Sequence, residues 1–148
     1  MARRETPISE ITLRRYEKPY EAGKRELLKK ACLSLGLLQP GDSRDVVVDV
    51  LYILLEAKKA LNSEDIVKGV LELRKNEKLP ETGTAPSNIR RQMRRLREMM
   101  LVEKDKNSYR ITEGMKLTEI FDEKIQGIML KAISSRIREY LERIDKEF

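Results

Sequence analysis

The part of the chain that most constrains its fold lies between residues 86 and 100, where apolar and basic residues alternate at helical spacing. The apolar positions recur at intervals of four, three and four residues, so they share one face of a helix: Ile89, Met93, Leu96 and Met100. Pro86 stands where the first turn of a helix tolerates proline. Between the apolar positions are five arginines: Arg90, Arg91, Arg94, Arg95 and Arg97. The pattern predicts a helix with one face on a core and a basic face turned toward a polyanion.

The basic charge is concentrated in this region of the sequence. The chain has a formal net charge of +6 over 148 residues. Residues 86–111 hold eight Lys or Arg and three Asp or Glu, whereas residues 112–148 hold seven and eight. A smaller basic excess lies in residues 1–45. Such a local excess is typical of a nucleic-acid-binding surface, although a helix face that is simply solvated would also tolerate it.

Composition favours a soluble, mostly helical protein and argues against several classes of function. Charged residues make up 38% of the chain, and only seven residues are aromatic. The chain has no histidine and a single cysteine, Cys32, so we expect no zinc site, no histidine-based catalysis and no cofactor. No glycine-rich phosphate loop and no nucleophile–base pair is present, and we therefore expect a protein that is not an enzyme.

The same composition bears on where the protein works. No apolar run is long enough to cross a membrane, and no signal peptide is apparent at the N-terminus, so we expect a cytoplasmic protein without a membrane partner. The absence of histidine and the scarcity of glutamine, beside abundant Lys, Arg and Glu, suggest a thermophilic source.

Residues 1–41 predict a basic arm followed by a helix. The arm contains Arg3, Arg4, Arg14 and Arg15, and Ile11, Leu13 and Tyr16 are candidates to anchor it as a short strand. Two interpretations of the arm remain open. It either contacts phosphate or a minor groove, or it is a charged terminus that is partly disordered or packs on a partner subunit. The helix is expected over residues 21–35, with Gly36 as its left-handed stop.

Two further helices and a hairpin surround the basic helix. Residues 46–59 are apolar on nearly every side and predict a buried central helix, although the four valines alone would favour a strand. A capped helix is expected over residues 63–76, and residues 77–85 form a loop that contains Pro80 and Gly83. After the basic helix, two short alternating runs around residues 105–107 predict a β-hairpin.

Residues 115–148 predict helix, with a shift in the register of the apolar stripe near Gly127 that marks a kink or a break. The closing part spaces its apolar residues by three and four: Leu130, Ile133, Ile137, Tyr140 and Ile144. This stripe is longer than one small core can cover, and we expect it to pair with a second copy of the chain. The alternative is a helix that folds back on its own domain.

Two motifs give a specific resemblance. The run Arg95-Leu96-Arg97-Glu98-Met99-Met100-Leu101-Val102-Glu103-Lys104, followed by Tyr109-Arg110-Ile111-Thr112-Glu113-Gly114, resembles the recognition helix and wing of MarR- and PadR-type regulators of prokaryotic or archaeal origin. In those families an "R-L…G-L-V-E" turn leads to a wing that closes on "L-T-E-x-G". The similarity covers residues 45–114 in plan. This chain has Met100 where those families often have glycine, and residues 77–85 exceed the usual short turn.

The resemblance implies a fold that is mainly α with a small β-hairpin wing. It divides the chain into an N-terminal arm and helix (1–41), a winged helix-turn-helix DNA-binding domain (42–114) and a C-terminal helical dimerisation segment (115–148). It also implies the residues that would contact DNA from the recognition helix and the wing: Ser87, Asn88, Arg90, Arg91, Arg94, Arg95, Lys104, Lys106, Asn107 and Arg110.

We therefore expect a homodimeric transcriptional regulator that binds double-stranded DNA in a sequence-specific manner. The alternative is a winged-helix module for protein interaction, chromatin architecture or assembly of a complex, whose arginine face meets acidic protein or RNA.

Overall fold

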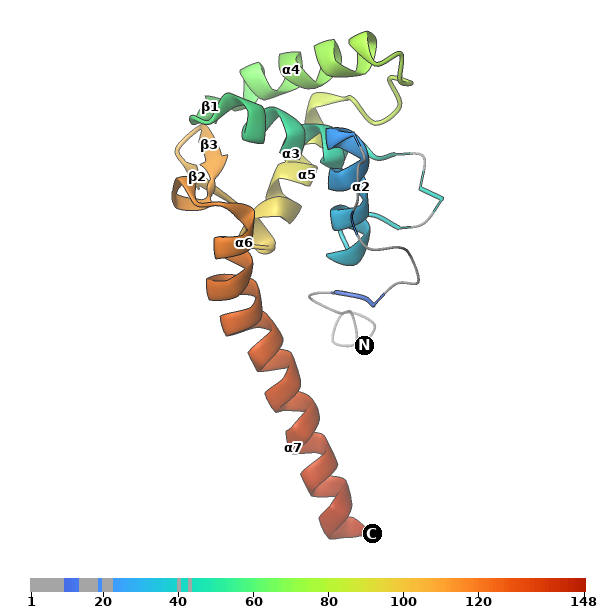
Figure 1. Cartoon of the computed structure of the whole chain (residues 1–148), viewed down its shortest axis with the longest axis vertical. Coiled ribbons are helices and arrows are strands. Elements are labelled where there is room, and N and C mark those ends of the chain that lie inside the picture. Colours follow the sequence, from blue (N-terminus) through green and yellow to red (C-terminus); the bar gives the residue numbers. More distant parts are fainter. Residues whose placement is uncertain (1–9, 14–18, 20–22, 40, 43) are drawn as a thin grey trace.

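The computed structural model describes residues 10–13, 19, 23–39, 41–42 and 44–148. These residues are mainly helical and include one small antiparallel sheet of three strands (Figure 1). The helices and strands are α2 (Lys24–Ser34), α3 (Val46–Ala57), β1 (Leu61–Asn62), α4 (Ser63–Asn76), α5 (Pro86–Glu98), β2 (Val102–Asp105), β3 (Ser108–Ile111), α6 (Leu117–Ile120) and α7 (Lys131–Glu147).

Helix α3 is the centre of the core. Its first six residues and Leu54 are buried, and α2, α4 and α5 all pack against it. The prediction of a buried central helix over residues 46–59 is confirmed. The surrounding helices α2, α4 and α5 bury much of α3, and this packing outweighs the preference of the four valines for a strand. The helix ends at Ala57, two residues before its predicted end, and Lys58 follows with a left-handed φ of 53°.

The sheet has the strand order β1-β3-β2, with both pairs antiparallel. Val102 lies opposite Ile111 and Asp105 opposite Ser108, so the predicted hairpin is confirmed and its turn is formed by Lys106 and Asn107. Strand β1 was not predicted, because two residues are too few to show alternation. It pairs Leu61 with Tyr109 and so fastens the hairpin to the start of α4.

A buried network of ion pairs joins α2, α3 and α4, and nothing in the apolar periodicity predicts it. Arg74, which is 1% exposed, donates from Nη1 to Asp45 Oδ1 at 3.1 Å and to Asp49. Arg25 approaches the same two carboxylates, at 3.0 Å each. Burial alone would raise the pKa of Asp45, but its hydrogen bonds and charge interactions with Arg25 and Arg74 hold that pKa below its ordinary value.

The network also anchors the loop between α4 and α5. Arg74 Nε donates to the Pro80 carbonyl at 2.6 Å, and the backbone N–H of Leu79 donates to the Arg74 carbonyl at 2.8 Å. At the other end of the loop, Asn88 Nδ2 donates to the Gly83 carbonyl at 2.7 Å. The loop is unusually long, but hydrogen bonds fix both of its ends. The start of α5 is thereby held against α3.

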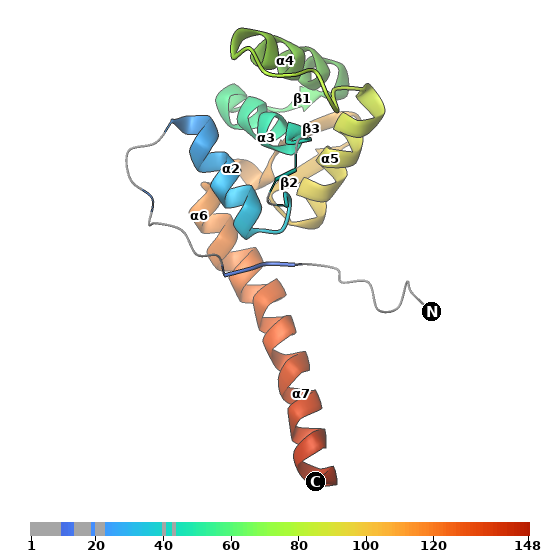
Figure 2. The same ribbon diagram turned by 90° about the vertical axis from the view of Figure 1, so that its right-hand side faces the viewer.

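The C-terminal region is one unbroken helix from Leu117 to Glu147. Residues Phe121–Leu130, between α6 and α7, are π-helical, which accounts for the shift in register of the apolar stripe. The expectation of a kink or break at Gly127 is therefore replaced by a change of helical pitch. A side chain at Gly127 would place its Cβ 3.1 Å from the Asp122 carbonyl oxygen. The helix leaves the domain, and none of the residues of α7 is buried (Figures 1 and 2).

The N-terminal region begins its described part at Glu10. The Thr12 N–H donates to the Ser34 carbonyl at 3.0 Å, and Ile11 packs on the core, whereas Leu13 is exposed. The Glu10 backbone crosses Gly36 so closely that a Cβ there would lie 2.6 Å from the Glu10 carbonyl oxygen. Gly36 has the predicted left-handed φ, at 78°. Arg3, Arg4, Arg14, Arg15 and Tyr16 lie outside the described residues.

Candidate nucleic-acid interface

Helix α5 has the two faces that its sequence predicts. Ile89, Met93 and Leu96 are fully buried against the core, and Pro86 occupies the first turn. Two exposed arginines, Arg91 and Arg94, lie on the opposite side, and two more, Arg90 and Arg97, are exposed at the flank of the buried face. None of these four arginines makes an ion pair within the described part of the chain. Ser87 is also exposed, at the N-terminal end of the same helix. The helix therefore presents a row of cations that are not neutralised internally.

Two of the expected contact residues on α5 have structural partners instead. Asn88 uses Nδ2 to bond the Gly83 carbonyl, and its Oδ1 accepts from Gln92 Nε2 at 3.2 Å. Arg95 donates to Gln92 Oε1 at 2.9 Å and to the Gly36 carbonyl at 3.3 Å. The positions 88, 92 and 95 follow one another along a helix, so they form a hydrogen-bonded line between the buried face and the exposed arginines. Gln92 was not predicted, although its spacing from Asn88 was the available signal.

The hairpin supplies a second group of cations, of which Lys106 is the most prominent. Lys106 is exposed in the turn, with a left-handed φ of 57°. Lys104 Nζ lies 5.4 Å from the centre of the Tyr109 ring, so its stem is held along the sheet. Arg110 pairs with Glu103 across the two strands, and Asn107 Oδ1 accepts from Ser63 Oγ at 3.0 Å. Lys104 and Lys106 thus remain as the positive charges that the hairpin offers.

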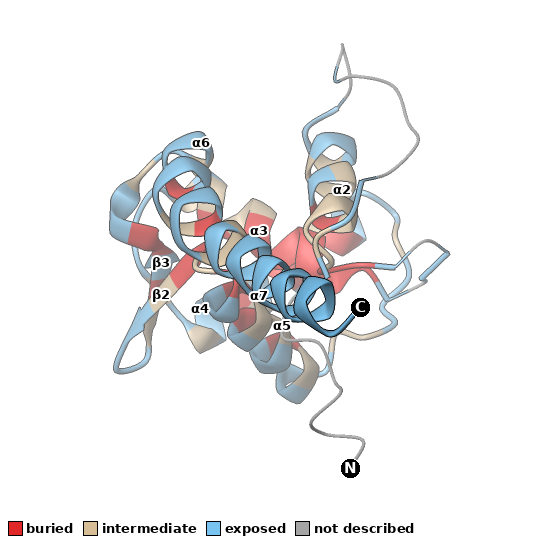
Figure 3. Ribbon diagram, turned by 90° about the horizontal axis from the view of Figure 1, so that it is seen from below, coloured by how far each residue is buried: buried red, intermediate tan, exposed pale blue. Residues whose placement is uncertain are grey.

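The hairpin turn and α5 lie on the same side of the domain. Seen along the C-terminal helix, both lie toward the lower edge of the view, with α3 above α5 (Figure 3). The side view shows α3 between α2 and α5, so the outer face of α5 points away from the core and across the direction of α7 (Figure 2). Among the expected contact residues that α5 and the hairpin carry, the exposed ones include Ser87, Arg90, Arg91, Arg94, Lys104 and Lys106.

Met100 ends α5 in a conformation that favours glycine. It adopts a left-handed φ of 66° directly after α5. The Leu101 N–H donates to the Leu96 carbonyl at 3.1 Å, and the Met100 N–H to the Arg97 carbonyl at 2.9 Å. This is the hydrogen-bonding pattern that ends a helix with a left-handed residue, for which glycine has no steric cost. The departure in sequence therefore leaves the backbone geometry of the motif intact.

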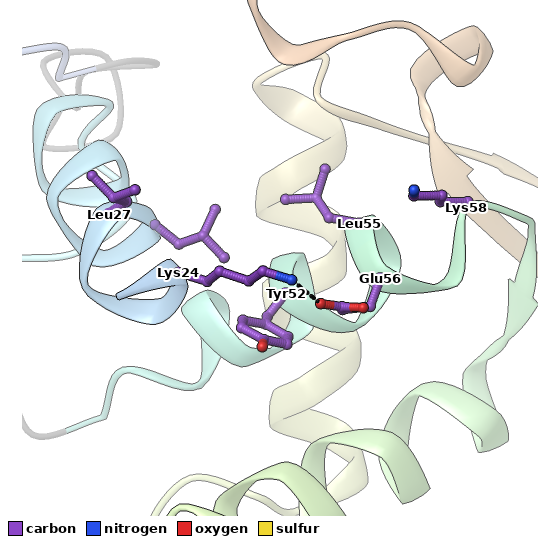
Figure 4. Close-up of a pocket in the computed structure, with 7 residues that line it drawn as sticks. Lys24, Leu27, Tyr52, Leu55, Glu56 and Lys58 are labelled. Atoms are coloured by element: carbon purple, nitrogen blue, oxygen red, sulfur yellow. Dashed lines mark hydrogen bonds and ion pairs between the residues drawn. The ribbon is translucent and has the colours of Figure 1, made fainter. Parts of the chain in front are cut away.

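A separate pocket of about 330 Å³ lies between α2 and α3 (Figure 4). Leu27, Leu28 and Leu55 contribute apolar lining, and Lys24 Nζ contacts Glu56 Oε1 at 2.8 Å. Helix α3 lies between α2 and α5 (Figure 2). None of the residues that line the pocket belongs to α5 or to the hairpin, so the pocket does not extend the candidate interface.

No family model, no curated protein and no solved structure matches the chain. Within the described residues, no helix is both long and apolar enough to cross a membrane. No cluster of three metal-ligating side chains occurs in that part of the chain either.

Proposed function

We propose that this protein binds double-stranded DNA through α5 and the β2–β3 hairpin, as a homodimeric winged helix-turn-helix regulator. The order α3, α4, α5 and hairpin agrees with that plan, and β1 adds a third strand to the hairpin. The observation that carries the proposal is the row of exposed arginines on α5, on the side of the domain where the β2–β3 hairpin also lies (Figure 3).

Affinity in this proposal comes mainly from the DNA backbone. Arg91 and Arg94 lie one turn apart on the outer face of α5, and each would replace condensed counterions on the phosphates. The hairpin would straddle a neighbouring row of phosphates with Lys104 and Lys106. Binding of this kind weakens steeply with salt, because the logarithm of the binding constant falls by about 0.9 per phosphate for each tenfold rise in salt concentration.

A second candidate is an architectural or complex-assembly role without a preferred DNA sequence. It is favoured by the internal hydrogen bonds of Asn88 and Arg95, since amide and guanidinium groups that are already bonded are poorly placed to read base edges. Ser87, Arg91 and Arg94 would then carry any sequence preference. Selection of bound duplexes from a random pool separates the two roles: a palindromic consensus supports the regulator, and a pool without enrichment supports the architectural protein.

Dimerisation is proposed for residues 115–148, separate from the DNA-binding domain at 42–114. The apolar stripe of α7 faces solvent, which is costly for a soluble protein unless a partner covers it. A symmetric dimer would also supply two copies of α5 for two half-sites on DNA. The N-terminal segment 1–41 contributes α2 to the domain.

The decisive experiment reverses two charges on α5. We expect the double variant Arg91→Glu, Arg94→Glu to lose at least about thirtyfold in duplex affinity at low salt, since two arginine contacts worth about 1–3 kcal/mol each amount to at least about 2 kcal/mol. Fluorescence anisotropy with a labelled duplex, repeated over a series of salt concentrations, measures the loss. The matched control is Lys131→Glu with Lys146→Glu on α7, which changes the net charge equally.

The control should retain near-normal affinity, and both variants should keep the circular dichroism spectrum of the native protein. Duplex binding that survives the change on α5 would reject α5 as the recognition helix. Equal losses in both variants would mean that net charge, rather than this surface, determines binding.

A further inference from the structure

Helix α7 carries an apolar face that nothing in the described chain covers. Over 17 residues, about 25 Å of helix, no residue is buried. The apolar side chains along this face are between 38% and 65% exposed: Ile133, Ile137, Tyr140, Leu141 and Ile144. The helix itself holds five Lys or Arg and four Asp or Glu. An apolar stripe on a nearly neutral helix suits a partner of the same kind, and a second copy of α7 is such a partner.

Five apolar residues, four on α7 and Leu130 directly before it, are spaced symmetrically about Ile137. Leu130, Ile133, Ile137, Leu141 and Ile144 are separated by three, four, four and three residues. The series reads the same in both directions, so a second α7 that runs the opposite way places an apolar residue against each of these five residues, and places Ser134 against Tyr140. Leu130 then meets Ile144, Ile133 meets Leu141, and Ile137 meets its own copy.

The position of α5 distinguishes this arrangement from a parallel pair. The outer face of α5 points across the direction of α7 (Figures 2 and 3). Two parallel helices have their two-fold axis along α7, and that axis would turn the second arginine face away from the first. For both faces to meet one duplex, the two-fold axis must point toward the DNA, perpendicular to α7. Such an axis reverses the direction of α7.

We propose that two copies of this protein pair through α7 in antiparallel orientation, with Ile137 at the two-fold axis. The choice of orientation rests on the proposed binding of one duplex by both copies. Charge does not oppose the arrangement, because the arginines that flank Ile137 have partners on their own helix. Arg136 Nε lies 3.2 Å from Glu139 Oε2, and Arg138 Nη1 lies 4.0 Å from Glu142 Oε1.

Disulfide cross-linking of the full chain tests the orientation. One preparation carries Ile133→Cys and a second, distinguished by an affinity tag, carries Leu141→Cys. In an antiparallel pair these two positions are neighbours, so mixing and mild oxidation should give mainly the mixed dimer. Native Cys32 does not interfere, because burial raises the pKa of its thiol to about 12. Ser135→Cys, on the opposite side of α7 from Ile137, is the matched control and should cross-link poorly.

Each outcome decides the orientation or the contact face. Cross-links formed mainly within the Ile133→Cys preparation would show a parallel pair and overturn the inference, while leaving a dimer in place. Cross-linking of Ser135→Cys as efficient as that of the mixture would show that another face is used. A monomer by sedimentation of the unmodified chain would reject the dimer itself. None of these measurements uses DNA, so loss of the proposed DNA binding is recognised separately, by anisotropy.

Discussion

Replacing Arg74 by methionine would remove the cation at the centre of the buried network while keeping most of the volume of its side chain. Arg74 contacts both Asp45 and Asp49, and Asp49 is completely buried. After the substitution, two carboxylates would face each other with Arg25 as their remaining cation. A buried carboxylate without sufficient compensation strongly disfavours the folded state.

The magnitude follows from what remains around the two carboxylates. Breaking a buried ion pair by removing one partner costs about 3–5 kcal/mol. Arg25 still reaches Asp45 and Asp49 at 3.0 Å, and Pro80 is exposed, so its carbonyl can bond water instead of Arg74 Nε. We therefore expect the lower end of the range, about 3 kcal/mol of the free energy of unfolding. For a chain of this length that corresponds to a fall in Tm of roughly 10 °C.

Urea denaturation followed by circular dichroism at a fixed protein concentration measures the change, since the chain has no tryptophan to report by fluorescence. Adding Asp49→Asn should recover part of the loss, because it removes the carboxylate that Arg74 compensates. The double variant should then be more stable than the sum of the two single changes by about 1 kcal/mol or more. A loss below about 1 kcal/mol for Arg74→Met, or strict additivity, would refute this account of the network.

Two further substitutions test the hairpin and the same network. Lys106→Gly should leave the protein at least as stable, since glycine has no steric cost at a φ of 57°, yet it should lower the salt slope of duplex binding by about one per protomer. An unchanged slope in the anisotropy series would remove Lys106 from the interface. For Asp45, a folded-state pKa below the unfolded value stabilises the fold above about pH 4, and this contribution disappears as the pH falls through the folded pKa. As the pH falls from about 5 to about 2, roughly the range in which a depressed Asp pKa acts, the Asp45→Asn variant should therefore lose less free energy of unfolding than the native chain. Equal losses in urea titrations of the two proteins would disprove this role of Asp45.

The elements that the sequence predicts well are those that repeat a period over many residues. The buried face of α5 and the long stripe of residues 115–148 are of this kind, and both lie in helices. Strand β1 escaped prediction because it consists of Leu61 and Asn62 alone. The ion-pair network could not be predicted for another reason. Asp49 visibly interrupts an otherwise apolar run, but its partners Arg25 and Arg74 lie on other helices, 24 and 25 residues away in sequence. A buried carboxylate signals that some cation must exist, and only the packing of α2 and α4 shows which one.

The arginines show why the candidate site could be predicted only in part. Arg74, Arg95, Arg110 and Arg91 are chemically identical, and three of them have an internal role. Arg74 is enclosed by carboxylates, Arg95 bonds the Gly36 carbonyl, and Arg110 is neutralised by Glu103. The helical spacing of the sequence shows that Arg91 lies away from the buried face of α5. The same spacing does not show which arginine finds a hydrogen-bond acceptor on another element, as Arg95 does at the Gly36 carbonyl. Counting arginines in a basic segment therefore overestimates its charge toward a partner, and a charge reversal at Arg110 should affect the fold of the hairpin before it affects any phosphate contact.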